Sequence, residues 1–368
     1  MTKILLSITA MRFGGAERVI STIANDLVEQ GHDVTLMSLQ NTDSSYDLDE
    51  RVKYVKSSLE INKNSKINYF FSMLRGGVEG YRFYKKVMNE VNPKIVLSFL
   101  ENATFISSVY RRFHDSHKLV ISERNDVTNN SYKIKKIKKI LYKYVDKVVC
   151  QSDVVASYYN EKFKIPNDKI KVIGNPLNPD SFFNGDISQL KREKQILAVG
   201  RLCEQKNFEL ALESFRTVHQ KFPDYKLKII GEGDLRNKLE SQIACLGLEN
   251  AVQMNGEEFL PFVKNASSSL FIMTSKYEGF PNVLIEAMAS GLPVVTTDFS
   301  PGVAKEIIKS KSNGIIVDSF KAEDFAQALI KEISDKELRN KQSINNIYVR
   351  TVFSDKEIIK SWESFLLS

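Results

Sequence analysis

Two glutamates eight positions apart, Glu278 and Glu286, are the residues of this chain whose type and spacing point most directly to chemistry. Between them, Pro281 suits the first position of a helix, where its missing N–H costs no hydrogen bond. Gly291 and Pro293 supply a left-handed cap and a stop at the other end. The pattern predicts a helix that begins at about Pro281, with Glu278 in the loop before it and Glu286 roughly 8 Å along its axis at 1.5 Å per residue.

The amino terminus of this predicted helix is suited to binding phosphate. Its first backbone N–H groups, from Asn282 to Leu284, lack helical partners and carry a partial positive charge. A diphosphate bound there would have a sugar near one glutamate and a ribose near the other. The spacing therefore favours a nucleotide-sugar site. The donor-binding residues expected around it are Gly279, Phe280, Pro281, Asn282, Val283, Leu284 and Glu286.

Cations and glycines follow other predicted strands. Arg201 and Lys206 come just after a strand near 195–199, where they are expected to reach a cleft at the strand ends. Arg forks across two phosphate oxygens and Lys acts as a compact charge. The pairs Gly14-Gly15 and Gly231 with Gly233 allow a phosphate or sugar to approach the backbone closely.

These segments match the motifs of one enzyme family in order. The matching segments are Gly14-Gly15-Ala16-Glu17, Gly200-Arg201-Leu202 with Lys206-Asn207, Gly231-Glu232-Gly233, the E-x7-E stretch from Glu278, and a final helix that bears Trp362. Together they resemble the family 4 retaining glycosyltransferases, enzymes of the GT-B fold that move a sugar from a nucleotide donor. The resemblance covers nearly all 368 residues.

The resemblance implies a role for each matched residue. Glu278, Arg201 and Lys206 are the expected catalytic residues: the two cations bind the diphosphate, and Glu278 faces the transferred sugar. Glu286 accepts hydrogen bonds from two ribose hydroxyls. In retaining members the β-phosphate of the leaving group helps to deprotonate the acceptor, so no protein nucleophile, cofactor or metal is expected. On family grounds the donor is UDP-linked, and the sugar is a hexose or N-acetylhexosamine.

One position departs from the family pattern. Many members carry a His near the sugar, whereas this chain has Arg124 there, and Arg is a poor base at ordinary pH. His32 is expected to be structural, and His114, His117 and His219 are expected to be exposed. The polar groups that remain at strand ends for the acceptor are Glu101, Asn102, Glu123, Arg124 and Asn125.

Length and pattern predict two domains. Short apolar runs alternate with helix-length segments, which is typical of a parallel α/β sheet, and a Pro- and Gly-rich stretch at 174–179 interrupts the alternation. We expect a GT-B arrangement of two facing Rossmann-like domains with a cleft between them: 1–174 on the acceptor side and 175–354 on the nucleotide-sugar side. The helix 355–368 is expected to pack back on the first domain. The strands are expected near 3–9, 33–39, 94–99, 118–122, 146–151, 170–173, 195–199, 226–230, 251–254, 269–273, 293–297 and 314–317.

Composition excludes several other classes. The three cysteines are scattered without metal-ligand spacing, which indicates free thiols in a reducing, cytoplasmic compartment. Asp47 and Asp49 spell a D-x-D pattern that holds metal in another transferase fold, but they lie in a polar loop and are expected to be solvated. No run approaches the ~18 apolar residues of a membrane span. The short apolar start of the chain is expected to be a strand instead of a secretion signal.

The net charge of +7 is concentrated in the first half. Residues 1–174 carry 28 Lys/Arg and 19 Asp/Glu, whereas 175–368 carry 24 and 26. A lysine-rich helix at 132–148, with an apolar face at Ile134, Ile137 and Leu141, suits an anionic membrane surface, and a core-facing helix with a solvated lysine face fits equally. Aromatic and basic residues mixed over 66–86 also suit an interface. We expect a polyprenyl-pyrophosphate-linked acceptor at the inner face of the cell membrane, and no nucleic acid.

The sequence leaves other functions open. The preferred function is a retaining, metal-independent hexosyltransferase of bacterial surface glycan synthesis. A UDP-N-acetylglucosamine 2-epimerase-like enzyme shares the two-domain architecture and needs no acceptor. A non-catalytic sugar-nucleotide-binding subunit is the third hypothesis, because the family His is missing.

Overall fold

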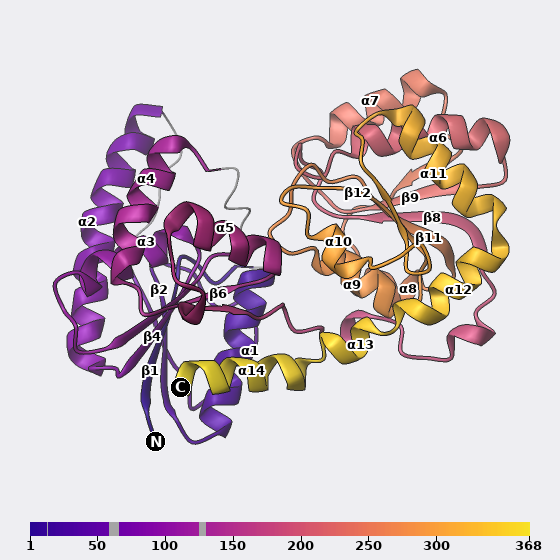
Figure 1. The fold of residues 1–368 in the computed structure, drawn as a ribbon. Coiled ribbons are helices and arrows are strands. Elements are labelled where there is room, and N and C mark those ends of the chain that lie inside the picture. The colour runs from indigo at the N-terminus through magenta and orange to yellow at the C-terminus, as the bar shows by residue number, and fades with distance from the viewer. Residues whose placement is uncertain (13, 59–65, 125–129) are drawn as a thin grey trace. The chain divides into compact units, whose positions relative to one another are not determined.

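The computed structural model describes residues 1–12, 14–58, 66–124 and 130–368, with side chains from residue 77 onward in the helix that begins at Lys66. The chain divides into two compact units. The first comprises Met1–Asn175 with Ile358–Ser368, and the second comprises Pro176–Glu357. Each unit is built around a parallel sheet with helices on its faces (Figure 1), which confirms the expected α/β class.

In its described part the first unit has a seven-stranded sheet in the order β3-β2-β1-β4-β5-β6-β7. Its strands are β1 (Lys3–Ile8), β2 (Asp33–Ser38), β3 (Lys53–Lys56), β4 (Ile95–Phe99), β5 (Lys118–Ser122), β6 (Lys147–Cys150) and β7 (Ile170–Val172). Its helices are α1 (Gly15–Glu29), α2 (Lys66–Val91), α3 (Glu101–Arg111), α4 (Tyr132–Leu141) and α5 (Asp153–Phe163). The sequence did not predict β3, because it is a short edge strand without a fully buried residue.

The second unit has a six-stranded sheet in the order β10-β9-β8-β11-β12-β13. Its strands are β8 (Glu193–Val199), β9 (Lys226–Ile230), β10 (Val252–Met254), β11 (Ser268–Met273), β12 (Val294–Thr297) and β13 (Ile315–Val317). Its helices are α6 (Phe208–Lys221), α7 (Arg236–Leu246), α8 (Pro261–Lys264), α9 (Asn282–Ala289), α10 (Ala304–Ile307), α11 (Ala322–Ser334), α12 (Lys336–Asn346) and α13 (Val349–Val352). The expected strands all occur, with small shifts at their ends.

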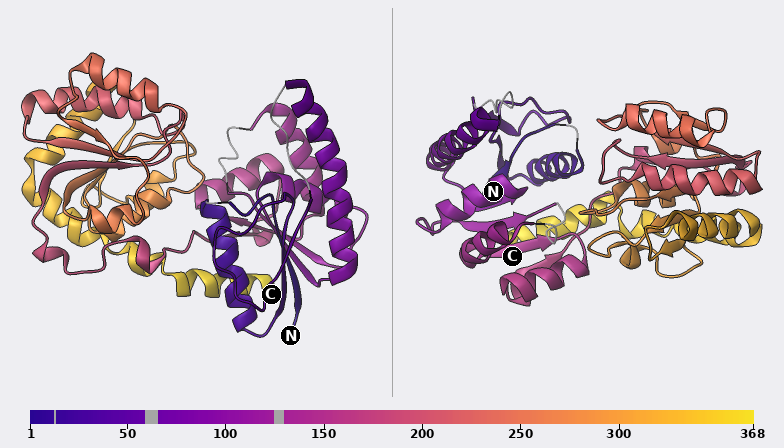
Figure 2. Two further views of the ribbon diagram at one scale, coloured as in Figure 1. Left: turned by 180° about the vertical axis from the view of Figure 1, so that it is seen from behind. Right: turned by 90° about the horizontal axis from the view of Figure 1, so that it is seen from above.

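Helices cover both faces of the second sheet, as Figure 2 shows from above. Buried apolar residues of α6, α7 and α11 form one core cluster, and those of α9 and α10 form another with α13. The central strands β8 and β11 contribute residues to both clusters, since successive side chains of a strand point to opposite faces. This two-sided burial fixes the strand ends from which the candidate site residues project.

The last helix, α14 (Asp355–Leu367), begins in the second unit and ends in the first. Its Trp362 is fully buried, and the ring centroid lies 5.6 Å from that of Phe99 at the end of β4. The carbonyls of Phe365 and Leu366 accept hydrogen bonds from Lys118. Aromatic packing and a cation at the helix end therefore anchor α14 to the first sheet.

The basic segment differs from the expected amphipathic helix. The helix α4 ends at Leu141 and a short 3-10 turn follows, so the expected apolar face does not continue to residue 148. Ile137 and Ile140 are about half exposed, whereas Lys138 on the expected polar face is fully buried. Lys138 instead reaches inward to the buried carboxylate of Glu123 and the partly exposed carboxylate of Glu101.

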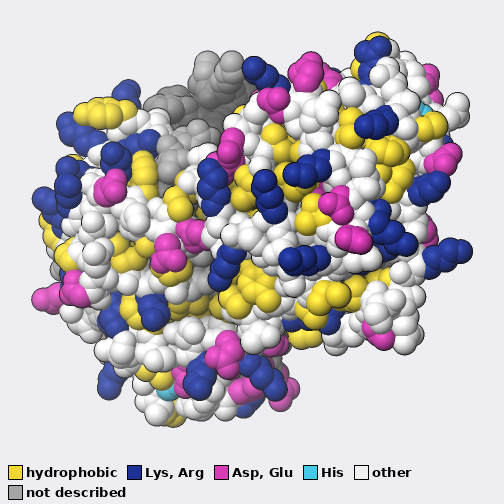
Figure 3. Space-filling view, turned by 45° about the vertical axis from the view of Figure 1, so that its right-hand side comes forward, with side chains coloured by type: hydrophobic (Ala, Val, Ile, Leu, Met, Phe, Trp, Pro, Cys, Tyr) yellow, Lys and Arg dark blue, Asp and Glu magenta, His cyan; other side chains and the backbone are white. Residues whose placement is uncertain are grey.

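The surface bears mixed charges. Lys and Arg side chains are spread over the face seen in Figure 3 instead of forming one continuous patch. No helix in the described part of the chain is both long enough and apolar enough to span a bilayer.

Candidate functional site

The loop that follows β8 is held in place by a glycine contact in the second unit. Gly231 and Gly233 have φ values of +145° and +157°, which favour glycine. A Cβ on Gly231 would lie 1.9 Å from the Gly200 carbonyl oxygen, and one on Gly233 would lie 2.4 Å from the Leu202 oxygen. These glycines thus let two strand-end loops pack backbone to backbone, and they position the residues after Gly200.

That loop brings Lys206 to Glu278. Lys206 Nζ lies 2.7 Å from Glu278 Oε1, and both side chains are largely buried. Gln205 Nε2 donates to Glu278 Oε2 at 3.2 Å and to the Tyr277 carbonyl at 2.9 Å. The structure therefore joins two of the three expected catalytic residues in one charge-assisted contact.

Backbone hydrogen bonds fix the same contact. Lys276 N donates to the Gln205 carbonyl at 2.8 Å, and Thr274 Oγ1 donates to the Lys206 carbonyl at 2.9 Å. Glu278 N donates to the Ser300 carbonyl at 2.9 Å. The loops after β8, β11 and β12 are tied together at the carboxyl ends of adjacent strands, where α/β sheets bind ligands.

The helix α9 begins beside this cluster. Pro281 is its N-cap residue and Asn282 its first helical residue, one position later than expected. The amides of Asn282 and Leu284 were expected to be free, but they donate to the carbonyls of Phe280 and Pro281, each at 3.0 Å. Both N–H groups therefore already form hydrogen bonds to nearby carbonyls. To bind a phosphate at the start of α9, they would have to break these hydrogen bonds and donate to phosphate oxygens instead.

Other donor-side residues lie nearby in sequence and in the same unit. Arg201 is exposed in the loop after β8, and Glu286 lies half-buried within α9. Phe280 packs edge-on against Phe353, with ring centroids 5.7 Å apart. Gly291 has φ +67°, which confirms the predicted left-handed end of this helix. Gly279 and Val283 are half-buried, and Leu284 is buried in the core.

In the first unit, Gly14 and Gly15 lie where α1 begins after β1. Gly14 is the N-cap residue with extended backbone, and its N–H donates to Tyr46 Oη at 3.0 Å. The Tyr46 hydroxyl in turn donates to the Gly14 carbonyl at 2.8 Å. Tyr46 is therefore a site neighbour that the glycine pattern alone did not reveal.

Glu123, an expected acceptor residue, lies in a buried polar network. Its carboxylate accepts hydrogen bonds from Lys138 at 2.7 Å, from Tyr159 at 3.0 Å and from Tyr142. Lys138 Nζ also lies 2.9 Å from Glu101 Oε1. Burial, followed by the charge of Glu123, raises the pKa of the Tyr142 and Tyr159 hydroxyls well above their usual range. Glu123 thus holds together the side chains around the end of β5, and no local pattern indicated Lys138 as its partner.

Arg124 is buried against two neighbouring aromatic rings. Its guanidinium carbon lies 4.7 Å from the Phe99 centroid and 5.6 Å from the Trp362 ring. Burial lowers the pKa of Arg124 to about 9, and its Nε and Nη2 have no hydrogen-bond partner in the described residues. Among the other acceptor candidates, Asn102 is exposed on α3, and Asn125 lies outside the described residues.

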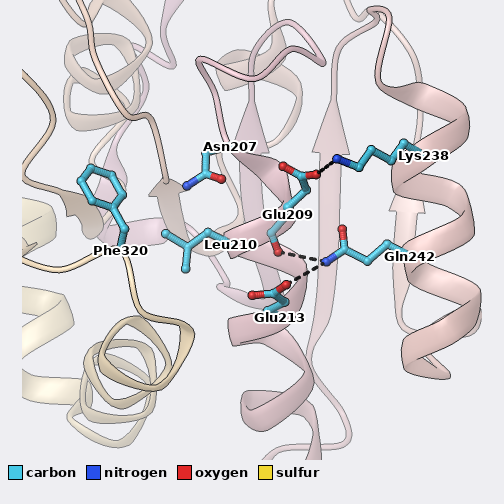
Figure 4. A pocket seen from close by; sticks show the side chains of 7 residues that line it. All are labelled: Asn207, Glu209, Leu210, Glu213, Lys238, Gln242 and Phe320. Carbon is cyan, nitrogen blue, oxygen red and sulfur yellow. Dashed lines mark hydrogen bonds and ion pairs between the residues drawn. The ribbon is translucent and has the colours of Figure 1, made fainter.

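A pocket of about 390 Å³ opens where Asn207 leads into α6 (Figure 4). Figure 4 shows Glu209 and Glu213 on one wall, with Lys238 and Gln242 reaching toward them from α7. Glu278, Arg201 and Lys206 do not line it. This pocket is therefore separate from the Lys206–Glu278 contact.

The D-x-D pair lies at the surface, with Asp47 exposed and Asp49 partly exposed. Asp49 forms hydrogen bonds to Arg51 at 2.7 and 2.8 Å, and these contacts lower the pKa of Asp49 to about 2. Among the described residues, no group of three or more His, Cys, Asp or Glu side chains is arranged to hold a metal ion.

Two family models match the chain. "Glycosyltransferase Family 4" covers residues 13–181, and "Glycosyl transferases group 1" covers residues 183–348. The amylovoran biosynthesis glycosyltransferase AmsD of Erwinia amylovora is 28% identical, with full coverage of both chains.

Two further comparisons agree with this match. An N-acetylgalactosaminyltransferase of Campylobacter jejuni, which is named for a diphospho-undecaprenol-linked acceptor, is 28% identical over 92% of each chain. The structure of Anabaena HepE in complex with UDP superposes with a TM-score of 0.79 at 17% identity, over 99% of each chain. The chain therefore belongs to the family 4, group 1 glycosyltransferases and has their GT-B fold.

Proposed function

We propose that the protein is a retaining glycosyltransferase that moves a hexose or N-acetylhexosamine from a UDP-sugar to a lipid-linked glycan in bacterial surface polysaccharide synthesis. The observation that carries this proposal is the Lys206–Glu278 contact at the carboxyl ends of β8 and β11. It joins a cation for a leaving diphosphate with a carboxylate for the transferred sugar. The names of the relatives from Erwinia and Campylobacter support the glycan class, and the UDP complex of HepE supports the nucleotide.

The proposed reaction breaks the bond between the anomeric carbon of the sugar and the β-phosphate oxygen. Arg201 and Lys206 bind the phosphate oxygens, where negative charge accumulates in the transition state. The acceptor hydroxyl forms the new glycosidic bond on the same face of the sugar and transfers its proton to the departing β-phosphate. Glu278 orients the sugar and stabilises its developing positive charge, and Glu286 binds the ribose hydroxyls.

Donor binding changes the partners of Lys206. In the structure its ammonium group contacts Glu278 alone among the carboxylates described near it. A diphosphate adds a second anionic partner, so the cation becomes shared between Glu278 and the phosphate. The amides at the start of α9 add donors once they leave the carbonyls of the preceding loop.

We place the acceptor at an anionic membrane surface. The helix α4 exposes Tyr132, Ile137 and Ile140 beside Lys133, Lys136 and Lys139. Apolar side chains among lysines suit the boundary of an anionic bilayer, where each Lys is worth ~1 kcal/mol. In the 66–86 segment, Arg82, Lys85 and Lys86 are exposed, Tyr84 is buried, and the side chains of 66–76 lie outside the described residues.

The test is a panel of UDP-sugars incubated with a polyprenyl-diphosphate-linked glycan. UDP release and the anomeric configuration of the product are measured, with Glu278→Gln as the variant and exposed Glu249→Gln as its matched control. We expect acceptor-dependent UDP release with retained configuration, lost in Glu278→Gln and unchanged in Glu249→Gln. Sugar conversion without an acceptor would instead identify an epimerase, and UDP binding without turnover a binding subunit.

A further inference from the structure

A second polar pocket lies at the amino ends of the strands of the first sheet. Glu123 and Gly14 lie at the other side of this sheet, after the carboxyl ends of β5 and β1. The pocket has a volume of about 460 Å³ and is lined by residues at the amino ends of three adjacent strands. Lys94 precedes β4, Lys118 begins β5 and Lys147 begins β6. We name this site the amino-edge pocket. No residue assigned to the proposed transfer reaction lines it.

The amino-edge pocket has an excess of positive charge. Its lining has four cations, because Arg111 joins the three lysines, against the carboxylates of Asp115 and Asp146. The Asp146 carboxylate already accepts hydrogen bonds from Arg111 at 3.3 Å and from the Leu119 amide at 2.7 Å. The three lysines therefore have no strong carboxylate partner within the pocket.

Two of those lysines hold the end of α14. Lys118 Nζ donates to the Leu366 carbonyl at 2.8 Å, and Lys147 Nζ donates to the Phe365 carbonyl at 3.3 Å. Carbonyl oxygens carry only partial charge, so an anion competes well for these ammonium groups. An anion in the amino-edge pocket would therefore weaken the hydrogen bonds that hold the end of α14. This helix carries Trp362, the single tryptophan of the chain.

The pocket also contains a buried histidine without partners. His117 was expected to be exposed, but its side chain is 4% exposed and lines the pocket. Neither ring nitrogen has a hydrogen-bond partner among the described residues. Burial, followed by the nearby Arg111 charge, lowers the pKa of His117 to about 4, so the ring is neutral at physiological pH. A neutral imidazole offers one donor and one acceptor, and leaving such groups unpaired costs ~1–3 kcal/mol each.

We infer that the amino-edge pocket binds a phosphate group, free or as the monoester of a soluble metabolite, through Lys94, Lys118, Lys147 and His117. At neutral pH such a group has negatively charged oxygens for the lysines. In its protonated fraction it also has an O–H that matches the acceptor nitrogen of His117. Sulfate has the charge but no hydroxyl, which makes it a useful comparison. Occupancy draws Lys118 and Lys147 away from the last carbonyls of α14.

Calorimetric titration of the full chain tests the inference. Inorganic phosphate, glycerol 3-phosphate and sulfate are compared at equal ionic strength. The variants are Lys94→Met, which removes a cation that does not hold α14, and Lys171→Met, an exposed lysine of the same sheet outside the pocket. His117→Phe removes both ring nitrogens and keeps an aromatic ring near Tyr110.

We expect saturable phosphate binding, with sulfate weaker, Lys94→Met weakened roughly tenfold and Lys171→Met unchanged. Phosphate should also change Trp362 fluorescence, and His117→Phe should abolish the preference over sulfate. Tighter binding of glycerol 3-phosphate assigns the site to a monoester, and tighter binding of inorganic phosphate assigns it to the free ion. Absence of saturable binding, equal binding of sulfate, or equal weakening by Lys171→Met would overturn the inference.

Discussion

Replacing Lys206 by Met tests whether Lys206 and Glu278 form a buried ion pair that stabilises the second unit. Methionine keeps an unbranched apolar chain but removes the ammonium group 2.7 Å from Glu278. The side chains of the pair are 14% and 8% exposed, so the remaining carboxylate stays largely desolvated with Gln205 as its hydrogen-bond donor. Removing one partner of such a pair should destabilise the second unit by about 3 kcal/mol.

A double variant separates the ion pair from other effects of the substitution. Lys206→Met combined with Glu278→Gln removes both charges, and the Gln amide can still bond to Gln205. Because a buried pair replaced as a whole is nearly neutral, we expect the double variant to lie within about 1 kcal/mol of the native chain. Hydrogen exchange of the β8 and β11 amides measures this stability in the second unit alone.

The exposed pair Lys194–Asp224 is the matched control. Its N–O distance is also 2.7 Å, but its side chains are 62% and 72% exposed. Lys194→Met should leave exchange protection unchanged, since solvent screens exposed pairs. A buried ion pair is excluded if Lys206→Met lowers the stability of the second unit no more than Lys194→Met does, or if adding Glu278→Gln restores no stability.

Three further predictions concern other parts of the chain. Gly231→Ala should destabilise the second unit by at least about 2 kcal/mol in hydrogen exchange, because its Cβ would overlap a neighbouring backbone oxygen, whereas Gly77→Ala on an exposed part of α2 should be neutral or stabilising. Burial raises the pKa of Glu332 from 4.5 to about 7, so its stabilising contribution is complete below pH 4.5 and is lost as pH rises through 7. Glu332→Gln should therefore gain stability relative to the native chain from pH 5.5 to pH 8 in parallel unfolding measurements, and an unchanged difference contradicts this. Ile137→Ser with Ile140→Ser should weaken co-sedimentation with anionic vesicles by roughly tenfold, and equal binding of both proteins would exclude α4 from the membrane contact.

The helix of the proposed donor site could be predicted because its signals are local. Pro281 and Gly291 bracket α9 within a few residues of where the structure has it. The alternation of apolar runs gave the parallel sheets, since strands buried on both faces need continuous apolar sequence. The contact between Lys206 and Glu278 was not predicted, because 72 residues separate the two positions and the family resemblance assigned each of them only a ligand.

The mispredicted features depend on tertiary packing. His117 looks like a surface residue among polar neighbours, but the turn before β5 buries it. Lys138 follows the pattern of a solvated lysine face, but it points inward to Glu101 and Glu123. Each burial depends on partners far along the chain, which a local pattern does not encode.

The most direct test of the proposed donor site is a calorimetric titration with UDP of the native chain and of the Lys206→Met, Glu278→Gln double variant, with GDP and ADP for comparison. The double variant should stay folded, so a change in affinity reports the site and not the stability of the unit. We expect saturable UDP binding to the native chain, preferred over the other nucleotides, and at least about tenfold weaker binding to the double variant. Equal UDP affinity in the two proteins, or a native chain that binds none of the nucleotides, would contradict this expectation.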